Sequence, residues 1–392
     1  MTSYKHGLRV IETETKLPRP ATGLSGLQVV FGTAPINLVE EPKKAVNQLI
    51  LCRTFDEAVK KLGYSDDFEK YTLCQAMYAS FKLFKVAPVI FVNVLDPTKH
   101  KEAMSEKTVT VTNKQALLLE KGILLDTLVV KMDSTTLAKD TDYIASFNEI
   151  GSVIITVIPT GAAVAAQSLK VTADKLKPSE VTENDIVGGY NVGTGVETGL
   201  SLVRQVFPKY GMVPGTILAP GWSDKPAVSA MLQAKAELIN DRFRCMCLID
   251  MPGTTKKYTE VEGAKDRLGV LSKHAVALWP YVKVDNKVLA YSAVYDALCA
   301  SLDANNDDVP SLYPSNKVLN IDASCLADGT ETYLDESQGN ALNAVGVVTI
   351  INQVGIRAWG NNTAAYPGNI DPKDRWIAVR RMFNWYDNNF IL

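Results

Sequence analysis

Short apolar runs alternate with amphipathic stretches along most of this chain. Six runs read as strands, at residues 27–33, 48–52, 89–95, 216–219, 244–250 and 275–279. Between them, stretches with apolar residues at helical spacing predict helices at 67–84, 198–207, 225–240 and 258–268. Continuous apolar strands that alternate with helices are typical of a mainly parallel sheet covered by helices on both faces. We therefore predict an α/β core.

The period of the pattern changes to two between about residues 101 and 188. Residues 108–112 alternate, and residues 143–158 read as a hairpin around the turn Asn148-Glu-Ile-Gly151. Since no convincing long helix precedes Pro178, we predict an all-β domain inserted into the α/β core.

The remaining pattern completes a division into domains. A hairpin is expected at 281–290, a helix at 292–302, a strand at 347–352 and a helix at 373–386. We expect an N-terminal arm (1–25), a discontinuous α/β core domain (26–100 and 189–335), the inserted β domain (101–188) and a small α+β C-terminal domain (336–392).

The arm contains a strand-like stretch without a local partner. Its candidate pairing residues are Leu8, Val10, Ile11 and Thr13. The prolines that follow forbid a regular element, so the stretch must pair with something distant. It is either an edge strand of its own sheet or a strand donated to another subunit.

Composition excludes several classes of function. The formal net charge is −2, from 41 basic and 43 acidic residues, which is not that of a polybasic nucleic-acid binder. We see neither a signal peptide nor an apolar run long enough to span a membrane, and we expect a protein made and kept in a cytoplasm or released by lysis. The six cysteines are scattered and expected to be buried thiols.

No cofactor or metal site is expected. The acidic run from Asp303 to Asp308 lacks the glycine and glutamate of an EF-hand loop, and we interpret it as a solvated loop. The glycine run 188–199 matches neither phosphate-binding fingerprint, and we interpret it as a flexible connection between domains.

A hydrolase site has to be considered at the carboxyl ends of the predicted strands, where Ser223 and Asp250 lie. His274 precedes its strand, which would place it at the opposite sheet edge, roughly 15 Å from Ser223 at about 3.3 Å per strand residue. Two other histidines are distributed elsewhere, at His6 and His100. We therefore expect Ser223 or Asp224 to cap the following helix rather than to catalyse.

Four segments resemble the contractile phage tail sheath proteins, a family that includes the sheaths of phage-tail-like bacteriocins. These are residues 4–12 with 29–35, residues 209–229 with the continuation to Asp250, residues 344–352 with 357–367, and residues 371–383. They include the sequences Met-Val-Pro-Gly-Thr-Ile-Leu-Ala-Pro-Gly-Trp-Ser (212–223) and Arg-Trp-Ile-Ala-Val-Arg-Arg-Met-Phe (375–383). The resemblance covers nearly the whole chain outside the inserted β domain.

The resemblance implies a core of subtilisin-like topology without a protease site. It also implies that the arm adds a strand to a neighbouring subunit, in a C-terminal domain completed by that neighbour's own last strand. Family members usually continue beyond the helix at 373–386 to such a strand. We therefore expect an incomplete C-terminal domain and a weakly held arm in the present chain, which ends at Leu392.

The function that follows from the resemblance is structural and not enzymatic. A contractile sheath subunit would polymerise helically around an inner tail tube and contract to drive the tube through the target cell envelope. Its expected partners are copies of itself, the inner tube protein, and baseplate and tail terminator proteins, without nucleic acid or membrane insertion. The expected location is a virion tail assembled in the bacterial host cytoplasm.

Two surfaces are expected to matter in such an assembly. The inserted β domain would lie on the outside, and Arg375, Arg380 and Arg381 would form a basic strip facing an acidic tube, unless they are an ordinary solvated face. Two other classes of function remain as alternatives: an α/β hydrolase, and a monomeric binding module that presents the β insert.

Overall fold

The structure is a computed structural model that describes residues 24–392. Its centre is an eight-stranded sheet. The strand order across the sheet is β2 (Ile50–Cys52), β3 (Val89–Asn93), β1 (Gln28–Gly32), β13 (Thr216–Leu218), β14 (Met246–Asp250), β15 (Ala275–Leu278), β20 (Val347–Asn352) and β21 (Ile356–Trp359). The six inner strands are parallel and the two edge strands are antiparallel. The mainly parallel sheet predicted from the apolar runs is therefore confirmed.

Helices pack on both faces of this sheet. The helices of the described residues are α1 (Phe55–Leu62), α2 (Leu73–Met77), α3 (Glu183–Val187), α4 (Val206–Tyr210), α5 (Pro226–Glu237), α6 (Val261–Leu268), α7 (Tyr291–Ala304), α8 (Glu336–Ala344), α9 (Pro372–Arg375) and α10 (Ile377–Ile391). Since β1 and β13 start connections that run in opposite directions across the sheet, right-handed crossovers place α2 and α5 on opposite faces. Helix α7 contacts α2 and therefore shares its face.

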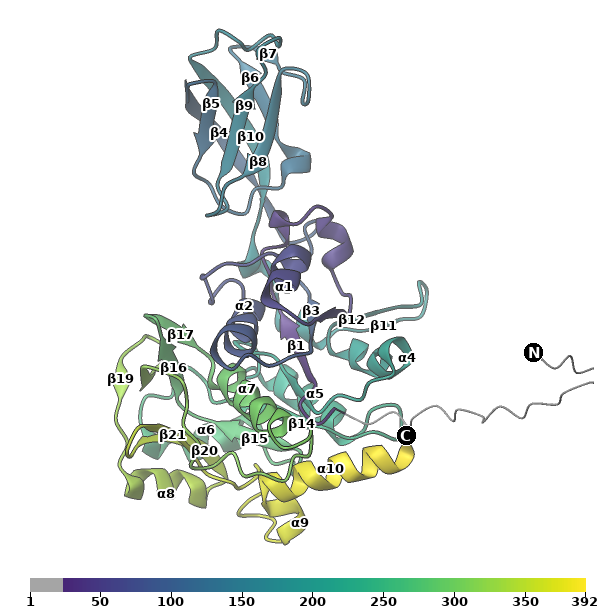
Figure 1. Cartoon of the computed structure of the whole chain (residues 1–392), viewed down its shortest axis with the longest axis vertical. Coiled ribbons are helices and arrows are strands. Elements are labelled where there is room, and N and C mark those ends of the chain that lie inside the picture. Colours follow the sequence, from purple (N-terminus) through teal and green to yellow (C-terminus); the bar gives the residue numbers. More distant parts are fainter. Residues whose placement is uncertain (1–23) are drawn as a thin grey trace, which may run out of the picture.

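A second sheet of seven strands forms the insert. Its order is β7 (Thr135–Thr136), β6 (Val129–Met132), β10 (Ser168–Leu176), β4 (Lys101–Thr112), β5 (Gln115–Leu118), β9 (Val153–Val157) and β8 (Tyr143–Phe147). Its buried residues form a hydrophobic cluster separate from that of the main body. The insert stands on the body at one end of the long axis, on a neck made by β4 and β10 (Figure 1).

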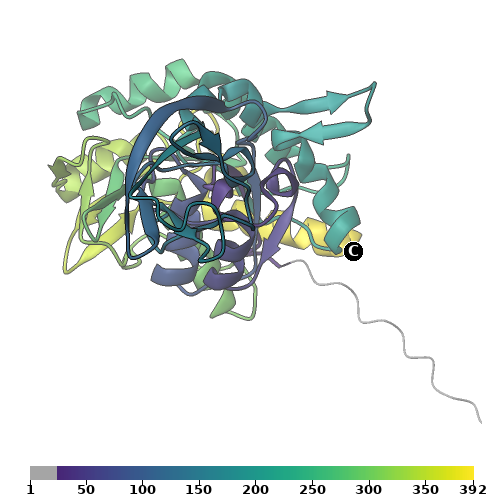
Figure 2. The same cartoon turned by 90° about the horizontal axis from the view of Figure 1, so that it is seen from above.

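Two smaller sheets complete the strand pairing. One has four strands in the order β17 (Lys287–Leu289), β16 (Tyr281–Val284), β18 (Ala323–Cys325) and β19 (Glu331–Thr332). The other is a separate hairpin of β11 (Gly189–Asn191) and β12 (Val196–Thr198). Seen from above, this hairpin projects sideways from the body (Figure 2). We expected the glycine run 188–199 to be a flexible connection, but it contains a pair of hydrogen-bonded strands.

Several predicted helices are shorter or broken. The predicted helix 67–84 is α2 followed by a π-helical stretch, Tyr78–Leu83, and the predicted helix 198–207 is a 3₁₀ turn, Gly199–Gln205, leading into α4. The helix expected at 373–386 is interrupted at Trp376, whose extended backbone (ψ 124°) separates α9 from α10. Local propensity recognised these helical regions but not the points where tertiary packing interrupts them.

The C-terminal segment does not form the separate α+β unit that was expected. Its strand β20 pairs with β15 and continues the main sheet, and Leu342, Val348 and Ile377 belong to the same hydrophobic cluster as the core strands. The segment is part of the main body because β20 hydrogen-bonds to β15 as a further parallel strand of the sheet.

Candidate functional site

The serine and aspartate at the carboxyl ends of the strands are buried together. The Ser223 hydroxyl donates to Asp250 Oδ2 (3.1 Å) and accepts from the Asp250 amide (3.0 Å). Ser292 donates to the same carboxylate from its amide (2.8 Å) and its hydroxyl (2.5 Å). Burial raises the pKa of Asp250 to about 6, although the bonds from Ser292 and Ser223 act in the opposite direction. Ser223 is 0% exposed, so this cluster fastens the strand ends to α7 and offers no accessible nucleophile.

We expected Ser223 or Asp224 to cap the next helix, and this prediction is wrong. Helix α5 starts at Pro226 and its N-cap is Lys225. Pro226 takes the first helical position, where a missing amide proton is tolerated.

Neither histidine in the described part of the chain contacts Ser223. The ring Nδ1 of His274 lies 3.2 Å from the Cys245 carbonyl oxygen and 3.3 Å from the Asn384 side-chain nitrogen. His100 accepts from the Asp96 amide (2.9 Å). Within residues 24–392 no group of three or more His, Cys, Asp or Glu side chains could hold a metal ion, and no helix is long and apolar enough to cross a membrane. The hydrolase alternative has no support in this arrangement.

All six cysteines are buried thiols, as expected. Burial raises the pKa of each thiol.

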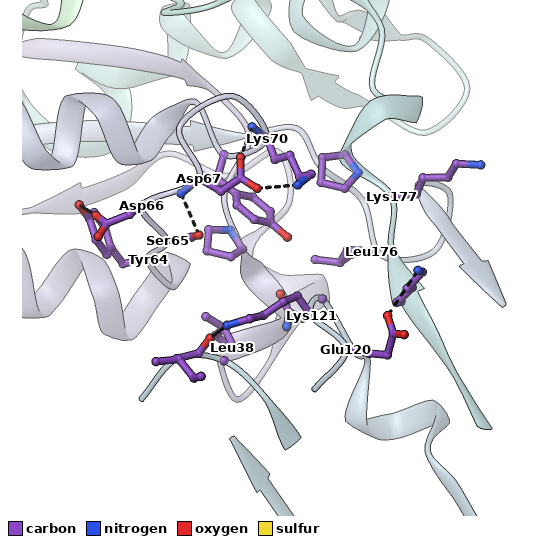
Figure 3. A pocket seen from close by; sticks show the side chains of 18 of the residues that line it. Leu38, Tyr64, Ser65, Asp66, Asp67, Lys70, Glu120, Lys121, Leu176 and Lys177 are labelled. Atoms are coloured by element: carbon purple, nitrogen blue, oxygen red, sulfur yellow. Dashed lines mark hydrogen bonds and ion pairs between the residues drawn. The ribbon is translucent and has the colours of Figure 1, made fainter. Parts of the chain in front are cut away.

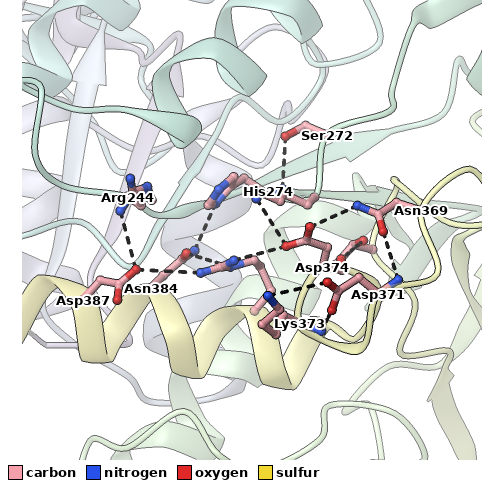
Figure 4. Close-up of polar contacts among 12 residues, drawn as sticks. Arg244, Ser272, His274, Asn369, Asp371, Lys373, Asp374, Asn384 and Asp387 are labelled. Carbon is pink, nitrogen blue, oxygen red and sulfur yellow. Dashed lines mark hydrogen bonds and ion pairs between the residues drawn. The ribbon is translucent and has the colours of Figure 1, made fainter.

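The basic strip expected on the last helix is absent from the described surface, because two of its three arginines point inward. Arg380 is 7% exposed, and its guanidinium bonds Asn384 (3.1 Å) and lies 3.3 Å from the Asp374 carboxylate. Figure 4 shows Asn384 and Asp374 within this network of polar contacts. The half-buried Arg375 stacks between the rings of Tyr366 and Trp376, each 4.2 Å from its guanidinium carbon.

Arg381 forms a buried ion pair with Asp303, the first residue of the run that we expected to be solvated. Asp303 lies in the last turn of α7 and is 0% exposed, and its Oδ2 is 2.5 Å from Arg381 Nη2. This pair joins α10 to α7. Asp303 is therefore not in a solvated loop, and Arg381 is not available to a partner.

The two faces of helix α10 lie opposite to the usual arrangement, with the polar face buried and the apolar face exposed. The charged and amide side chains Arg380, Arg381, Asn384 and Asn388 face the body and are buried. The outer face instead carries Val379, Phe383, Tyr386 and Phe390, the last three exposed by 39%, 59% and 84%. Val379, Phe383 and Tyr386, with Tyr313 and Met382, line an open groove of about 380 Å³, whereas Phe390 lies outside it. An aromatic outer face over a polar inner face marks a surface for a partner.

A larger cleft of about 910 Å³ separates the insert from the body (Figure 3). Its lining is mixed in charge, since Lys70, Lys121 and Lys177 alternate with Asp66, Asp67 and Glu120. Most of these groups are paired locally, as Lys70 is with Asp67 (2.6 Å). Ion pairs such as Lys175–Glu102 (3.3 Å) connect the strands of the neck beside the cleft. We therefore interpret the cleft as the boundary between the insert and the body and not as a ligand site.

The hairpin of β11 and β12 is fastened only at its base. Glu197, 4% exposed, pairs with Arg204 and accepts from the Gln205 side-chain nitrogen (2.5 Å). Beyond this anchor, residues 190–196 are all exposed. The arm residues Leu8, Val10, Ile11 and Thr13, which the sequence assigned to strand pairing, lie outside the described residues.

Comparison with known proteins finds tail sheath proteins among the relatives of this chain. No family model matches the chain. The tail sheath protein of Burkholderia phage BcepMu is 28% identical over 381 aligned residues, which cover 93% of this chain and 76% of that protein. A prophage major tail sheath protein of Pseudomonas aeruginosa (strain UCBPP-PA14) is 27% identical over 221 residues, 54% of this chain and 52% of that protein.

Solved structures agree on the fold. The sheath tail protein of Desulfitobacterium hafniense matches with a TM-score of 0.52 at 11% identity, over 98% of this chain and 82% of that one. The sheath complex of the extracellular contractile injection system PVC, in its contracted state, matches with a TM-score of 0.50 at 14% identity, over 100% and 74%. The chain is thus a homologue of a contractile tail sheath protein along nearly its whole length, and these relatives support a structural sheath subunit and not a hydrolase.

Proposed function

We propose that copies of this chain polymerise helically around an inner tail tube and contract to drive the tube through the envelope of a target cell. The observation that carries this proposal is the alignment with a tail sheath protein over 93% of the chain. A heterologous contact whose rotation does not close builds such a helical polymer. Contraction is then a change between two packings of subunits that move nearly as rigid bodies.

The outer face of α10 is the surface proposed to contact the tube. Its exposed side chains are Phe383, Tyr386 and Phe390 beside the groove that includes Tyr313. Because these groups are uncharged at neutral pH, the contact is expected to persist in salt, unlike one made by a basic strip.

The insert is proposed to lie on the outside of the sheath. It stands at one end of the body on its neck and carries a hydrophobic core of its own. We also propose domain boundaries at about residues 25, 100 and 189, and a subtilisin-like topology for the core. We further propose that the chain contacts baseplate and tail terminator proteins and assembles in the bacterial host cytoplasm.

Co-expression with a tube protein from the same tail tests the proposal. Negative-stain microscopy should show striated tubes or rings, and sedimentation should bring the chain down with the tube. Phe383→Ser with Tyr386→Ser should reduce co-sedimentation at least tenfold, in low and high salt alike. Leu271→Ser, at a position 63% exposed on another surface, is the matched control and should have no effect. Dispersed particles under every condition would overturn the proposal.

A further inference from the structure

The outward side of the insert's sheet has no charged side chain along three adjacent strands. Residues paired across neighbouring strands lie on the same side, and successive residues of a strand point to opposite sides. Ile155 and Ala116 are paired and buried in the core of the insert, so Ile154 and Leu117, also paired, point outward. The outward residues of β8, β9 and β5 form what we call the neutral face: Ile144, Ser146, Ile154, Thr156, Gln115 and Leu117.

The next strand continues this face without adding a charge. Thr112 of β4 is paired with Gln115, and Thr110 lies on the same side two residues earlier. Both threonines are exposed. The uncharged surface therefore extends across four strands of the insert.

The lack of charge is a property of this face and not of the insert's composition. Residues 101–188 contain 21 charged side chains, so charges are available and lie elsewhere. Several stand around the neutral face: Lys114 in the turn from β4 to β5, Glu149 in the turn from β8 to β9, and Lys170 on β10. An uncharged centre inside a charged rim is the composition of a protein–protein interface.

The neutral face is also partly apolar and open to solvent. Leu117 and Ile144 are 46% and 48% exposed. The solvated side of an antiparallel sheet normally has polar residues, and surface charges keep it soluble. The insert stands at the end of the long axis of the molecule (Figure 1), where the main body leaves these side chains exposed. The face therefore has the properties of an interaction surface.

The charge distribution favours a second copy of the same face as the partner. A charged partner would find no countercharge at the centre of this face, whereas two uncharged copies do not repel each other. Two sheets can pack face to face at about 10 Å. A contact between identical patches is closed, while a helical polymer grows through contacts between different patches. The second copy must therefore belong to another particle.

The size of the face indicates that many copies have to act together. Four strands about 4.8 Å apart, each contributing about four residues at about 3.4 Å, give roughly 250 Å² of sheet. Stable complexes bury about 800 Å² on each partner, so one pair of faces binds weakly. A sheath that presents many copies on its outside multiplies this weak contact.

We infer that the neutral face is a self-association surface through which assembled sheaths adhere side by side. The inference rests on the proposed sheath function and on the proposed outer position of the insert. Each contact joins the neutral face of one subunit to the same face of a subunit in the neighbouring particle.

A charge-swap experiment on the full chain, co-expressed with the tube protein, tests this contact. One variant carries Leu117→Lys with Ile144→Lys, and the other carries Leu117→Glu with Ile144→Glu. Both positions are exposed strand residues that point away from the core of the insert, so the fold should tolerate the charges. Leu271→Lys with Ile370→Lys, at body positions 63% and 71% exposed, adds the same two charges as the lysine variant and is the matched control.

Low-speed centrifugation collects bundled sheaths, and high-speed centrifugation collects single tubes. Wild type and the body control should enter the low-speed pellet, and negative-stain microscopy should show tubes lying in parallel. Each charged variant alone should enter that pellet at least tenfold less and still enter the high-speed pellet fully. Mixing lysine and glutamate particles should restore bundles, because opposite charges then face each other.

Three results would overturn the inference: wild-type tubes that remain dispersed, a lysine variant that bundles like the wild type, or a mixture of the two variants that stays dispersed. In each case the tubes themselves still form, so the sheath function stands while the self-association surface fails. An absence of tubes from the wild type would instead refute the proposed function, and the inference with it.

Discussion

Replacing Arg381 by methionine should destabilise the main body severely. The substitution removes a guanidinium that is 6% exposed and leaves the fully buried Asp303 carboxylate without its partner at 2.5 Å. Loss of one partner of a buried ion pair destabilises by about 3–5 kcal/mol. Domains are stable by only about 5–15 kcal/mol, so roughly a fifth or more of the free energy of unfolding would be lost.

The second partner and a surface pair provide the controls. Asp303→Leu combined with Arg381→Met removes both charges and should lie within about 1 kcal/mol of the wild type, since a buried pair is often replaceable by apolar groups. Arg244→Met breaks an ion pair of the same helix with Asp387 (3.5 Å), whose side chains are 40% and 39% exposed. Such a pair contributes about 0–1 kcal/mol.

Urea unfolding followed by tryptophan fluorescence is the assay. All five tryptophans lie outside residues 101–188, so the signal reports the main body without the insert. The double-mutant cycle should give a coupling of at least about 2 kcal/mol. A cost below about 1 kcal/mol for Arg381→Met, or no rescue by Asp303→Leu, would refute the view that this pair fastens α10 to α7.

Three further outcomes are expected. Burial and the neighbouring Arg380 and Lys273 lower the pKa of His274 to about 4, so the contribution of His274 to stability should fall by up to ~3 kcal/mol from pH 6.5 to pH 4, because the unfolded chain binds a proton there that the folded chain does not. Asp250, whose pKa is raised, acts in the opposite direction, so the measurement is the comparison with His274→Asn. The urea midpoint of this variant should fall less than that of the wild type as the pH is lowered, and an equal fall would contradict this. A Cβ on Gly188 would lie 2.0 Å from the Thr198 carbonyl oxygen, so Gly188→Ala should speed hydrogen exchange in the hairpin, whereas Gly211→Ala, also at positive φ but facing open space, should not. Limited proteolysis of assembled particles should cut the insert first, and earlier cleavage of the core would place the insert elsewhere.

The main sheet could be predicted from sequence because its strands are continuous apolar runs. Strand β20 occupies the predicted residues 347–352, and β13 and β15 lie within one residue of expectation. The addition of β20 to β15 could not be predicted, since an entire small sheet and two helices separate them along the chain. Periodicity locates elements but does not specify pairing between distant ones.

The last helix was misread for a related reason. The spacing of Val379, Phe383, Tyr386 and Phe390 is that of a core-facing stripe, and the arginines opposite read as solvent-facing. The structure reverses this because Asp303, 78 positions before Arg381, supplies a buried countercharge. Only the three-dimensional neighbour could have indicated which face is inside.

The neck has a consequence for how members of such a family can diverge. The chain leaves the body at Lys101 and returns at Leu176, and these two residues are paired partners in one antiparallel ladder. Paired residues lie about 5 Å apart, so any domain whose two ends meet at that spacing could replace the insert without disturbing the strands below. The strands of the body can thus stay unchanged while the inserted domain is exchanged or removed, by evolution or by protein engineering.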